Sequence, residues 1–205
     1  TLYFAISEAE ATAAQKTFPN GQCIVSGNPM RAGWDYSLKY SREEILDEMR
    51  LDHKTKLILV PGGKFLAGNM FRLTTILESV KTDSSVRVIF TTHPGDTSTR
   101  VRFSTGKSYD PYSELSEFDP RLLVYGGDKQ TRNLLPAADL VIEDTGSIGL
   151  EAHYRGIPTY TLRCTADQQR SVIANGGQQS EVDMVGIRAL NWVDISCTIG
   201  AALQD

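Results

Sequence analysis

The chain has 205 residues, enough for one large domain or two small ones with a sizeable core. Its hydrophobic share of 40% and charged share of 22% are ordinary for a globular protein, and its net charge of −4 argues against nucleic acid or an anionic membrane as the main partner. No apolar run approaches the roughly 20 residues of a membrane span, and no signal peptide is visible. We therefore expect a soluble, cytoplasmic protein.

Short apolar strands, most of them ended by glycine or proline, are predicted at residues 3–7, 22–30, 56–63 and 86–96. Helices are predicted between them at residues 7–18, 41–49 and 67–80. Ser7 with Glu10, and Ser41 with Glu44, have the spacing of a capping box at the first two helix starts.

The next stretch, residues 96–120, is polar and shows no clear period, so we expect a long surface excursion, a length that indicates function or mobility. Its role is open between a lid and a partner surface. Beyond it, strands are predicted at residues 121–127, 139–146 and 159–163. Helices are predicted at residues 129–138, where Pro136 closes or kinks the helix, and at residues 147–155, with Gly156 just past the end. The pattern after Thr165 is mostly helical.

Apolar strands that are each followed by a helix indicate a parallel sheet covered on both faces. The predicted fold class is therefore α/β, a single Rossmann-like, doubly wound domain over residues 1–205. Ligands of such sheets bind at the carboxyl ends of the strands.

The cysteines Cys23, Cys164 and Cys197 are widely spaced. An odd number without a Cys-x-x-Cys pair argues against a disulfide framework and against a structural zinc site. We expect all three to be small, buried and reduced. The chain also has no cluster of histidines and carboxylates in its sequence that indicates a metal site.

The loop at residues 144–147 reads Asp-Thr-Gly-Ser, the signature of an aspartic protease. Such proteases need an all-β setting and two facing loops of this kind. Here the motif occurs once, between a predicted strand and a predicted helix. A homodimer would supply a second aspartate, but the α/β pattern contradicts the protease fold.

A second interpretation uses the position of this loop before a helix. Gly146 lets the backbone approach a ligand closely, and the helix-start N–H groups near Gly146 to Gly149 point toward an anion. Thr145 and Ser147 add hydroxyl donors, and Glu151, one turn further on, can accept hydrogen bonds from ribose hydroxyls. The alternative is that Thr145 or Ser147 caps the helix and Glu151 complements its dipole. The residues alone leave both interpretations open.

The segment "ADLVIEDTGSIGLEAHYRGIPTYTLR" resembles the donor-binding segment of GT-B-fold glycosyltransferases and of UDP-N-acetylglucosamine 2-epimerases. The epimerase form is close to A-D-L-V-x-T-D-S-G-G-x-Q-E-E-A. Residues 144–147 fall on its D-S-G-G and Glu151 on its second glutamate. The resemblance implies that Glu151 binds ribose and that the turn binds the diphosphate.

Segments further upstream are similar to the same family in the same order, so that the resemblance covers roughly residues 4–163. "CIVSGNPM" resembles the family's lead into its second domain, "LDHKTKLILVPGG" its opening strand and glycine loop, and "VIFTTHP" its strand-His-Pro element. Two departures argue against epimerisation. Residues 61–65 read Pro-Gly-Gly-Lys-Phe where the epimerases carry G-H-R-x-E, and the epimerase acidic catalytic residues belong to a domain outside this chain.

Other candidate residues follow predicted strands. Gly62 and Gly63 form a turn whose N–H groups can face a phosphate, with Lys64 adding a charge; the alternative is a plain turn with an exposed lysine. His93 is the candidate for a bond to phosphate or sugar or for proton transfer, unless it binds only the local backbone.

In the resembled family, the segment at Tyr125 and Gly126 lines the nucleobase pocket, whereas the residues alone fit a turn with a packed tyrosine equally well. Arg163 is either near the donor or a surface charge. Glu143 is expected to be exposed, because adjacent strand residues such as Glu143 and Asp144 cannot both face one site.

The resemblance implies the nucleotide-sugar-binding half of a GT-B glycosyltransferase, with UDP as the expected nucleotide, no other cofactor and no metal. Residues 1–30 would lead in from a missing N-terminal acceptor half, or a separate subunit would supply that half, and residues 164–205 would form a C-terminal helical part. The chain alone is then expected to bind donor without transferring its sugar. The alternatives are an epimerase-like fragment and a non-catalytic nucleotide-binding or assembly module.

Overall fold

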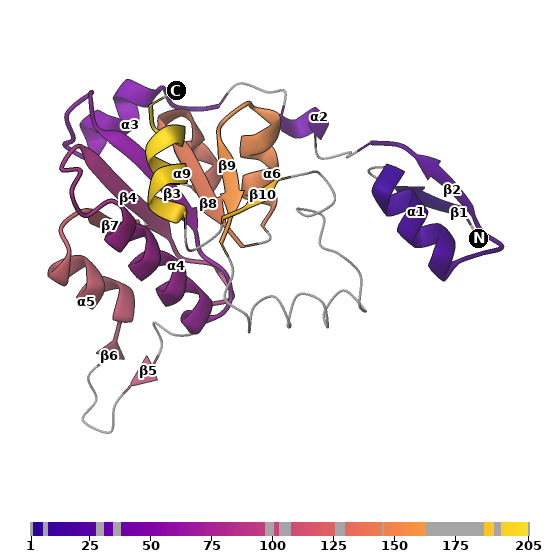
Figure 1. The fold of residues 1–205 in the computed structure, drawn as a ribbon, viewed down its shortest axis with the longest axis horizontal. Helices are drawn as coiled ribbons and strands as arrows, with labels where there is room; N and C mark the ends of the chain where they lie inside the picture. Colours follow the sequence, from indigo (N-terminus) through magenta and orange to yellow (C-terminus); the bar gives the residue numbers. More distant parts are fainter. Residues whose placement is uncertain are drawn as a thin grey trace.

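A computed structural model describes residues 2–5, 8–27, 31–34, 38–96, 101–102, 108–125, 130–144, 146–162, 187–190 and 194–204 of the chain. The elements near the amino end form a small unit of their own, and the remaining long strands form one larger sheet (Figure 1). Within the described ranges, no helix is both long and apolar enough to cross a membrane.

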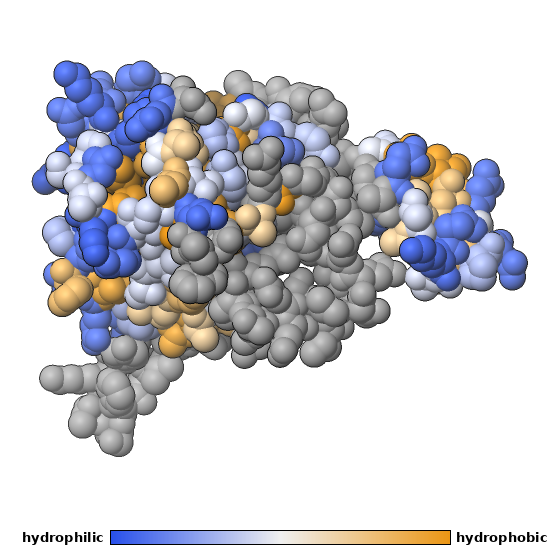
Figure 2. Space-filling view, in the orientation of Figure 1, coloured by the Kyte–Doolittle hydropathy of each residue, from blue (hydrophilic) through white to orange (hydrophobic). Residues whose placement is uncertain are grey.

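The first unit consists of β1 (Leu2–Ala5), α1 (Glu8–Thr17) and β2 (Gln22–Val25), as the sequence predicts. The two strands are parallel, and α1 covers one face of the pair, where the Tyr3 hydroxyl donates to Glu10 over 2.7 Å. The other face is uncovered within the described residues, and Figure 2 shows apolar surface on this unit. Ser7, half of the first predicted capping box, lies outside the described residues.

Two short helices, α2 (Arg31–Trp34) and α3 (Arg42–Glu48), lead into the main sheet. The second predicted capping box is confirmed at the start of α3. The Ser41 hydroxyl accepts from the Glu44 N–H over 3.2 Å, and the Ser41 N–H donates to the Glu44 carboxylate over 2.7 Å.

The main sheet has six parallel strands in the order β10-β9-β8-β3-β4-β7. Their bounds are β3 (Lys56–Pro61), β4 (Val86–Thr91), β7 (Leu122–Tyr125), β8 (Leu140–Glu143), β9 (Thr159–Thr161) and β10 (Arg188–Ala189). From β3 the chain adds β4 and then β7 on one side. It then returns to the other side of β3 and adds β8, β9 and β10. This doubly wound order confirms the predicted fold class. It also places a topological switch point, where such sheets bind ligands, between the carboxyl ends of β3 and β8.

Helices cover both faces of this sheet, and side chains alternate along each strand to meet them. Ile58 and Val60 of β3 enter a core shared with α4 (Leu66–Ser79), α5 (Pro111–Phe118) and α9 (Ile195–Ala202). Leu57 and Leu59 enter the opposite core, shared with α3, η2 (Thr131–Ala137) and α6 (Ser147–Tyr154). The strands β3, β4 and β8 are consequently buried on both faces, as their continuous apolar sequences predict.

Residues 96–120 depart from the prediction of a polar surface excursion. The stretch contains two short antiparallel strands, β5 (Val101–Arg102) and β6 (Ser108–Tyr109), followed by α5. The Asp110 side chain caps α5 by accepting from the Tyr112 and Ser113 N–H groups, and the Tyr112 side chain is fully buried. The missed signal was the Asp-Pro pair at residues 110–111, a capping residue followed by proline at the first helical position.

Three further predictions concern a helix, a glycine and the cysteines. The segment predicted as a helix at residues 129–138 is the 3₁₀ helix η2, which contains Pro136. Gly156 has the positive φ of 78° expected of a residue just past a helix end. The expectation of buried cysteines is wrong for Cys197, which is exposed, and for Cys23, which is half-buried; Cys164 lies outside the described residues, as does most of the region predicted as helical after Thr165.

Candidate functional site

The glycine turn after β3 is held tightly by its own protein. The Gly62 N–H donates to the Thr91 carbonyl over 2.8 Å, and a Cβ atom on Gly62 would lie 2.6 Å from that oxygen, so no side chain fits. The Gly63 N–H donates to the Asn69 Oδ1 over 2.7 Å. Both N–H groups therefore already have protein acceptors. Of the three residues predicted to contact phosphate at this turn, Lys64 has an exposed side chain.

Asn69 is a buried residue that joins the loops after β3 and β4 to α5 at the carboxyl edge. Its Nδ2 donates to the Gly63 carbonyl over 2.9 Å, to the Tyr112 hydroxyl over 2.7 Å and to the Asp96 carboxylate over 3.1 Å. Its Oδ1 also accepts from Arg72 over 2.6 Å, and Tyr112 donates to Asp96. This set of contacts was not predicted from the sequence. Its signal was two polar residues three apart on the apolar face of α4.

Arg72 reaches from α4 to the loop after β8. It is 1% exposed, and its Nη1 lies 3.7 Å from the Asp144 Oδ2. The same carboxylate oxygen would lie 3.5 Å from a Cβ atom on Gly63, so the loops that follow β3 and β8 meet here. The ion pair joins α4 to the loop after β8 at the topological switch point, a structural role for Asp144.

Glu143 corrects the prediction of an exposed side chain, since it is only 1% exposed. Adjacent strand residues point to opposite faces: Asp144 turns toward Arg72 of α4, and Glu143 turns beneath the first turn of α6. The Glu143 Oε2 accepts from the Gly149 N–H over 3.0 Å, and the Gly146 N–H also donates to this carboxyl group. Burial raises the pKa of Glu143 to about 8, against the lowering effect of these N–H groups.

Two backbone N–H groups at the start of α6, those of Gly146 and Gly149, therefore already bind the Glu143 carboxyl group. Gly149 must be glycine, because a Cβ atom there would lie 2.0 Å from the Glu143 Oε1. The N–H groups of Ser147 and Ile148, by contrast, bind no acceptor within the described residues. Gly146 and Ser147 are exposed, while Thr145 lies outside the described residues. Two of the predicted helix-start donors thus remain for an anion.

Glu151 lies one turn further on and is 2% exposed. Its Oε1 accepts from the Arg132 Nε over 2.8 Å and from the Arg155 Nε and Nη2 over 2.9 and 2.7 Å. Its Oε2 has no partner among the described residues. The sequence analysis missed both arginines, although Arg155 follows Glu151 by four residues, the spacing of a helical ion pair.

The remaining candidates sit along the same edge of the sheet. His93 is half-buried, and its Nδ1 accepts from the Gly95 N–H over 2.8 Å, which leaves the proton of the neutral ring on Nε2. A Cβ atom on Gly95 would lie 3.6 Å from the Lys64 side chain, so the loops after β3 and β4 are neighbours. Tyr125 is half-buried at the end of β7, whereas Gly126 and Arg163 lie outside the described residues.

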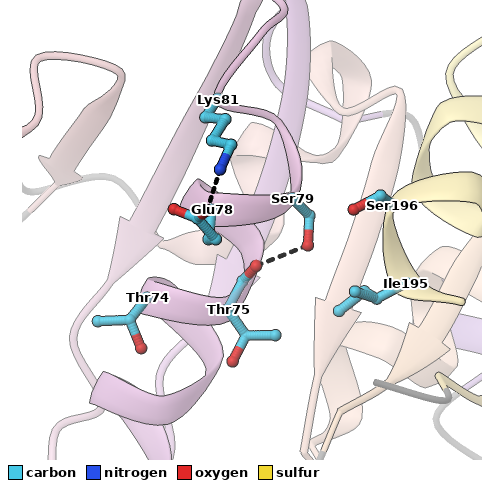
Figure 3. A pocket seen from close by; sticks show the side chains of 7 residues that line it. All are labelled: Thr74, Thr75, Glu78, Ser79, Lys81, Ile195 and Ser196. Carbon is cyan, nitrogen blue, oxygen red and sulfur yellow. Dashed lines mark hydrogen bonds and ion pairs between the residues drawn. The ribbon is translucent and has the colours of Figure 1, made fainter. Parts of the chain in front are cut away.

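A hollow of about 490 Å³ between α4 and α9 is not part of this edge (Figure 3). It lies at the carboxyl end of α4, away from Asn69. The hydroxyls of Thr74, Thr75 and Ser79 donate to backbone carbonyls of α4 itself. Three of the hydroxyls that line the hollow thus bind the backbone of α4, and within the described ranges no cluster of three or more His, Cys, Asp or Glu residues is arranged to hold a metal ion.

No protein-family model matches the sequence, and no curated protein matches it. Solved structures do share its fold. The UDP-GlcNAc 2-epimerase of Methanocaldococcus jannaschii, solved with UDP-GlcNAc and UDP, matches with a TM-score of 0.62 and 19% identity over 99% of this chain and 54% of its own. WaaG, a glycosyltransferase of lipopolysaccharide biosynthesis, matches with a TM-score of 0.57 and 18% identity over 98% of this chain and 53% of its own.

The wall teichoic acid polymerase TagF matches with a TM-score of 0.53 and 10% identity over 98% of this chain and 52% of its own. The chain thus spans about half the length of each of these structures. At such identities the likeness concerns the fold alone. The chain has the fold of one half of a GT-B protein, similar to the C-terminal half.

Proposed function

We propose that this chain, as one half of a GT-B fold, binds a nucleoside diphosphate sugar and serves as the donor half of a glycosyltransferase. One observation carries the proposal: α6 begins at the switch point, its Ser147 and Ile148 N–H groups bind no acceptor in the part of the chain that the structure describes, and Glu151 lies one turn away. A diphosphate at the helix start would accept from these two N–H groups, favoured by the helix dipole. The ribose hydroxyls would then donate to the Glu151 Oε2.

The charges around this point favour an anionic ligand. Arg132 and Arg155 together outweigh the single charge of Glu151, and Lys64 is exposed at the same edge. Glu143 lies directly behind the helix start, but burial raises its pKa to about 8, so at neutral pH its carboxyl group is mostly uncharged. A diphosphate would therefore meet little repulsion from it.

The proposed contribution to catalysis is electrostatic. Negative charge develops on the nucleoside diphosphate as it leaves the sugar, and the helix-start N–H groups with Lys64 would stabilise that charge. The acceptor site and the catalytic base would come from the other half of the GT-B fold, in the same polypeptide or in a separate subunit. The chain alone is then a donor-binding unit with little or no transfer activity.

An epimerase-like enzyme is the second candidate, because a UDP-GlcNAc 2-epimerase structure matches the fold with a TM-score of 0.62. The Pro-Gly-Gly-Lys-Phe sequence at residues 61–65 lacks the histidine and arginine of the epimerase motif, which favours transfer. Product analysis after completion of the second half separates the two: a transferase yields free UDP and a glycosylated acceptor, an epimerase yields an isomeric UDP-sugar.

Calorimetric titration with UDP, CDP, GDP and their sugars tests the proposal. Proline is tolerated at the first position of a helix and lacks an N–H, and the extended Gly146 backbone (φ −87°, ψ 161°) is compatible with a following proline. Ser147→Pro should therefore weaken diphosphate binding by about tenfold while preserving α6, the loss of one hydrogen bond to a charged group. Ser147→Ala, which keeps the N–H, is the matched control.

Saturable binding of a nucleoside diphosphate that is weakened by the proline and retained by the alanine supports the proposal. A folded wild-type chain that binds none of these nucleotides overturns it and leaves the third possibility, a non-catalytic module. The ribose contact has a separate test. The Glu151→Gln substitution should weaken the binding of UDP more than the binding of 2′,3′-dideoxy-UDP, because only UDP has ribose hydroxyls that donate to Glu151.

A further inference from the structure

Arg132 and Arg155 make contacts in two directions. One set goes to the Glu151 Oε1, at 2.7 to 2.9 Å. The other goes to backbone carbonyls of α2: the Arg132 Nη2 donates to the Gly33 carbonyl over 2.6 Å, and the Arg155 Nη2 donates to the Trp34 carbonyl over 2.5 Å. Both arginines therefore bridge the candidate ribose carboxylate and a distant part of the chain.

The segment they hold is the connection between two parts of the molecule. α2 follows the β1–α1–β2 unit and precedes the main sheet, and it lies beside α6 (Figure 1). Trp34 is 6% exposed and packs with Leu150 and Ile187, and its ring lies 5.2 Å from that of Tyr154. α2 is thus docked on α6 by one aromatic anchor and by the two arginines.

Arg132 and Arg155 stabilise the buried carboxylate of Glu151. Glu151 is almost fully buried, and a buried carboxylate without partners is unfavourable. Each arginine has a planar fork of donors, which lets it hold a carboxylate with one nitrogen and a carbonyl with another. If α2 left α6, each guanidinium group would lose its carbonyl acceptor. The two arginine side chains that orient Glu151 would then be held less firmly.

We propose that Arg132 and Arg155 are positioning residues that couple nucleotide binding at Glu151 to the docking of α2 on α6. The coupling rests on the proposed function, since it requires ribose to bind the Glu151 Oε2. A ribose on Oε2 holds Glu151 in place, Glu151 holds both guanidinium groups, and these hold the α2 backbone. By linkage, nucleotide favours docked α2 to the same extent as docked α2 favours nucleotide.

Trp34 is a natural reporter of this docking. The chain has two tryptophans, so Trp192→Phe leaves Trp34 as the single emitter. In that background, UDP should change the Trp34 emission with the same midpoint as calorimetric binding. Hydrogen exchange at residues 31–34 should slow on UDP binding.

Two kinds of variant separate coupling from simple support of the carboxylate. Arg132→Gln and Arg155→Gln should each weaken UDP by about tenfold and abolish the fluorescence response. Trp34→Ala leaves Arg132, Arg155 and Glu151 intact and removes only the anchor of α2, yet it should also weaken UDP, by roughly fivefold, a loss within the range of allosteric coupling. Arg87→Gln is the control, because Arg87 donates to the Ser84 and Val86 carbonyls at the opposite edge of the sheet.

The coupling is overturned if folded Trp34→Ala binds UDP with unchanged affinity and UDP does not change the Trp34 emission of the otherwise wild-type chain. This result leaves the proposed function standing. Loss of UDP binding in the arginine variants with no effect of Trp34→Ala also overturns the coupling, because the arginines then support only Glu151. Failure of the wild type to bind any nucleoside diphosphate overturns the coupling and the proposed function together.

Discussion

Glu143 and Gly149 share one small volume beneath the first turn of α6. The carboxyl group of Glu143 accepts from the Gly146 and Gly149 N–H groups, and the missing side chain of Gly149 provides the space for it. The carboxyl group thus takes the place of a polar side-chain cap, which the residue before the helix, Gly146, cannot supply. These two residues decide which of the helix-start donors remain for a ligand.

Gly149→Ala tests this pairing at the level of stability. Alanine favours a helix over glycine, but here its Cβ atom would displace the Glu143 carboxyl group, so the free energy of unfolding should fall by about 1–3 kcal/mol. Gly200→Ala in α9, where a Cβ atom meets nothing within 4 Å, should raise that free energy by about 0.5–1 kcal/mol. Urea denaturation of both variants is the measurement, and equal effects would contradict the pairing.

Glu143→Gln tests the charge state of the buried carboxyl group. Burial raises the pKa of Glu143 to about 8 in the folded chain from its ordinary value of 4.5, so between these values the folded state keeps a proton that the unfolded state releases. The stability that Glu143 contributes is then present below pH 4.5 and lost as pH rises toward 8. Wild-type unfolding free energy should drop between pH 5 and 8 by about 1–3 kcal/mol more than that of Glu143→Gln. Glu114→Gln, at an exposed position, should behave as the wild type.

Helix α4 shows how one element organises the edge of the sheet. Its apolar residues build the core, while Asn69 and Arg72 on the same face reach the loops after β3, β4 and β8. α5 joins the same network through Tyr112, whose ring packs 4.5 Å from that of Phe90. The candidate site is therefore held by buried polar contacts between elements.

Asn69→Ala should be among the costly substitutions of this chain. It leaves the Gly63 N–H and the buried Asp96 and Tyr112 with fewer partners, and we expect a fall of about 2–4 kcal/mol in the free energy of unfolding. Tyr112→Phe keeps the ring and removes one hydroxyl, so a smaller fall of about 1–2 kcal/mol is expected. Thermal melting measures both, with the exposed Asn20→Ala as the control. A neutral Asn69→Ala would show that the contacts of Asn69 contribute little.

At the scale of the whole molecule, the described residues leave one face of the strand pair at the amino end uncovered. Leu2, Phe4 and Ile24 lie on the face opposite α1 and are 52%, 59% and 39% exposed. Parallel strands are ordinarily buried on both faces, and a two-stranded sheet has little stability of its own. The solved structures that match this chain are about twice as long.

Hydrogen exchange should divide the chain accordingly. Amides of β1 and β2 are expected to exchange faster than those of β3 and β4, by about a hundredfold or more, because the small unit opens without unfolding the main sheet. Paired substitutions Leu2→Ser and Phe4→Ser should reduce binding of a hydrophobic dye without moving the melting temperature of the main sheet. Equal protection of the two sheets would show that they unfold as one.

The sequence by itself determined the α/β alternation, because apolar runs and helix caps are local signals. The strand-to-helix position of the loop at residues 144–147 and the capping box at Ser41 followed from the same signals. The tertiary structure alone decided which donors are occupied. The environments of Glu143, Glu151 and the Gly63 N–H depend on Gly149, Arg132, Arg155 and Asn69, which come from other elements or other turns. Burial and hydrogen bonding at the edge of a sheet depend on contacts between segments that are far apart in the sequence, and a local sequence pattern does not contain these contacts.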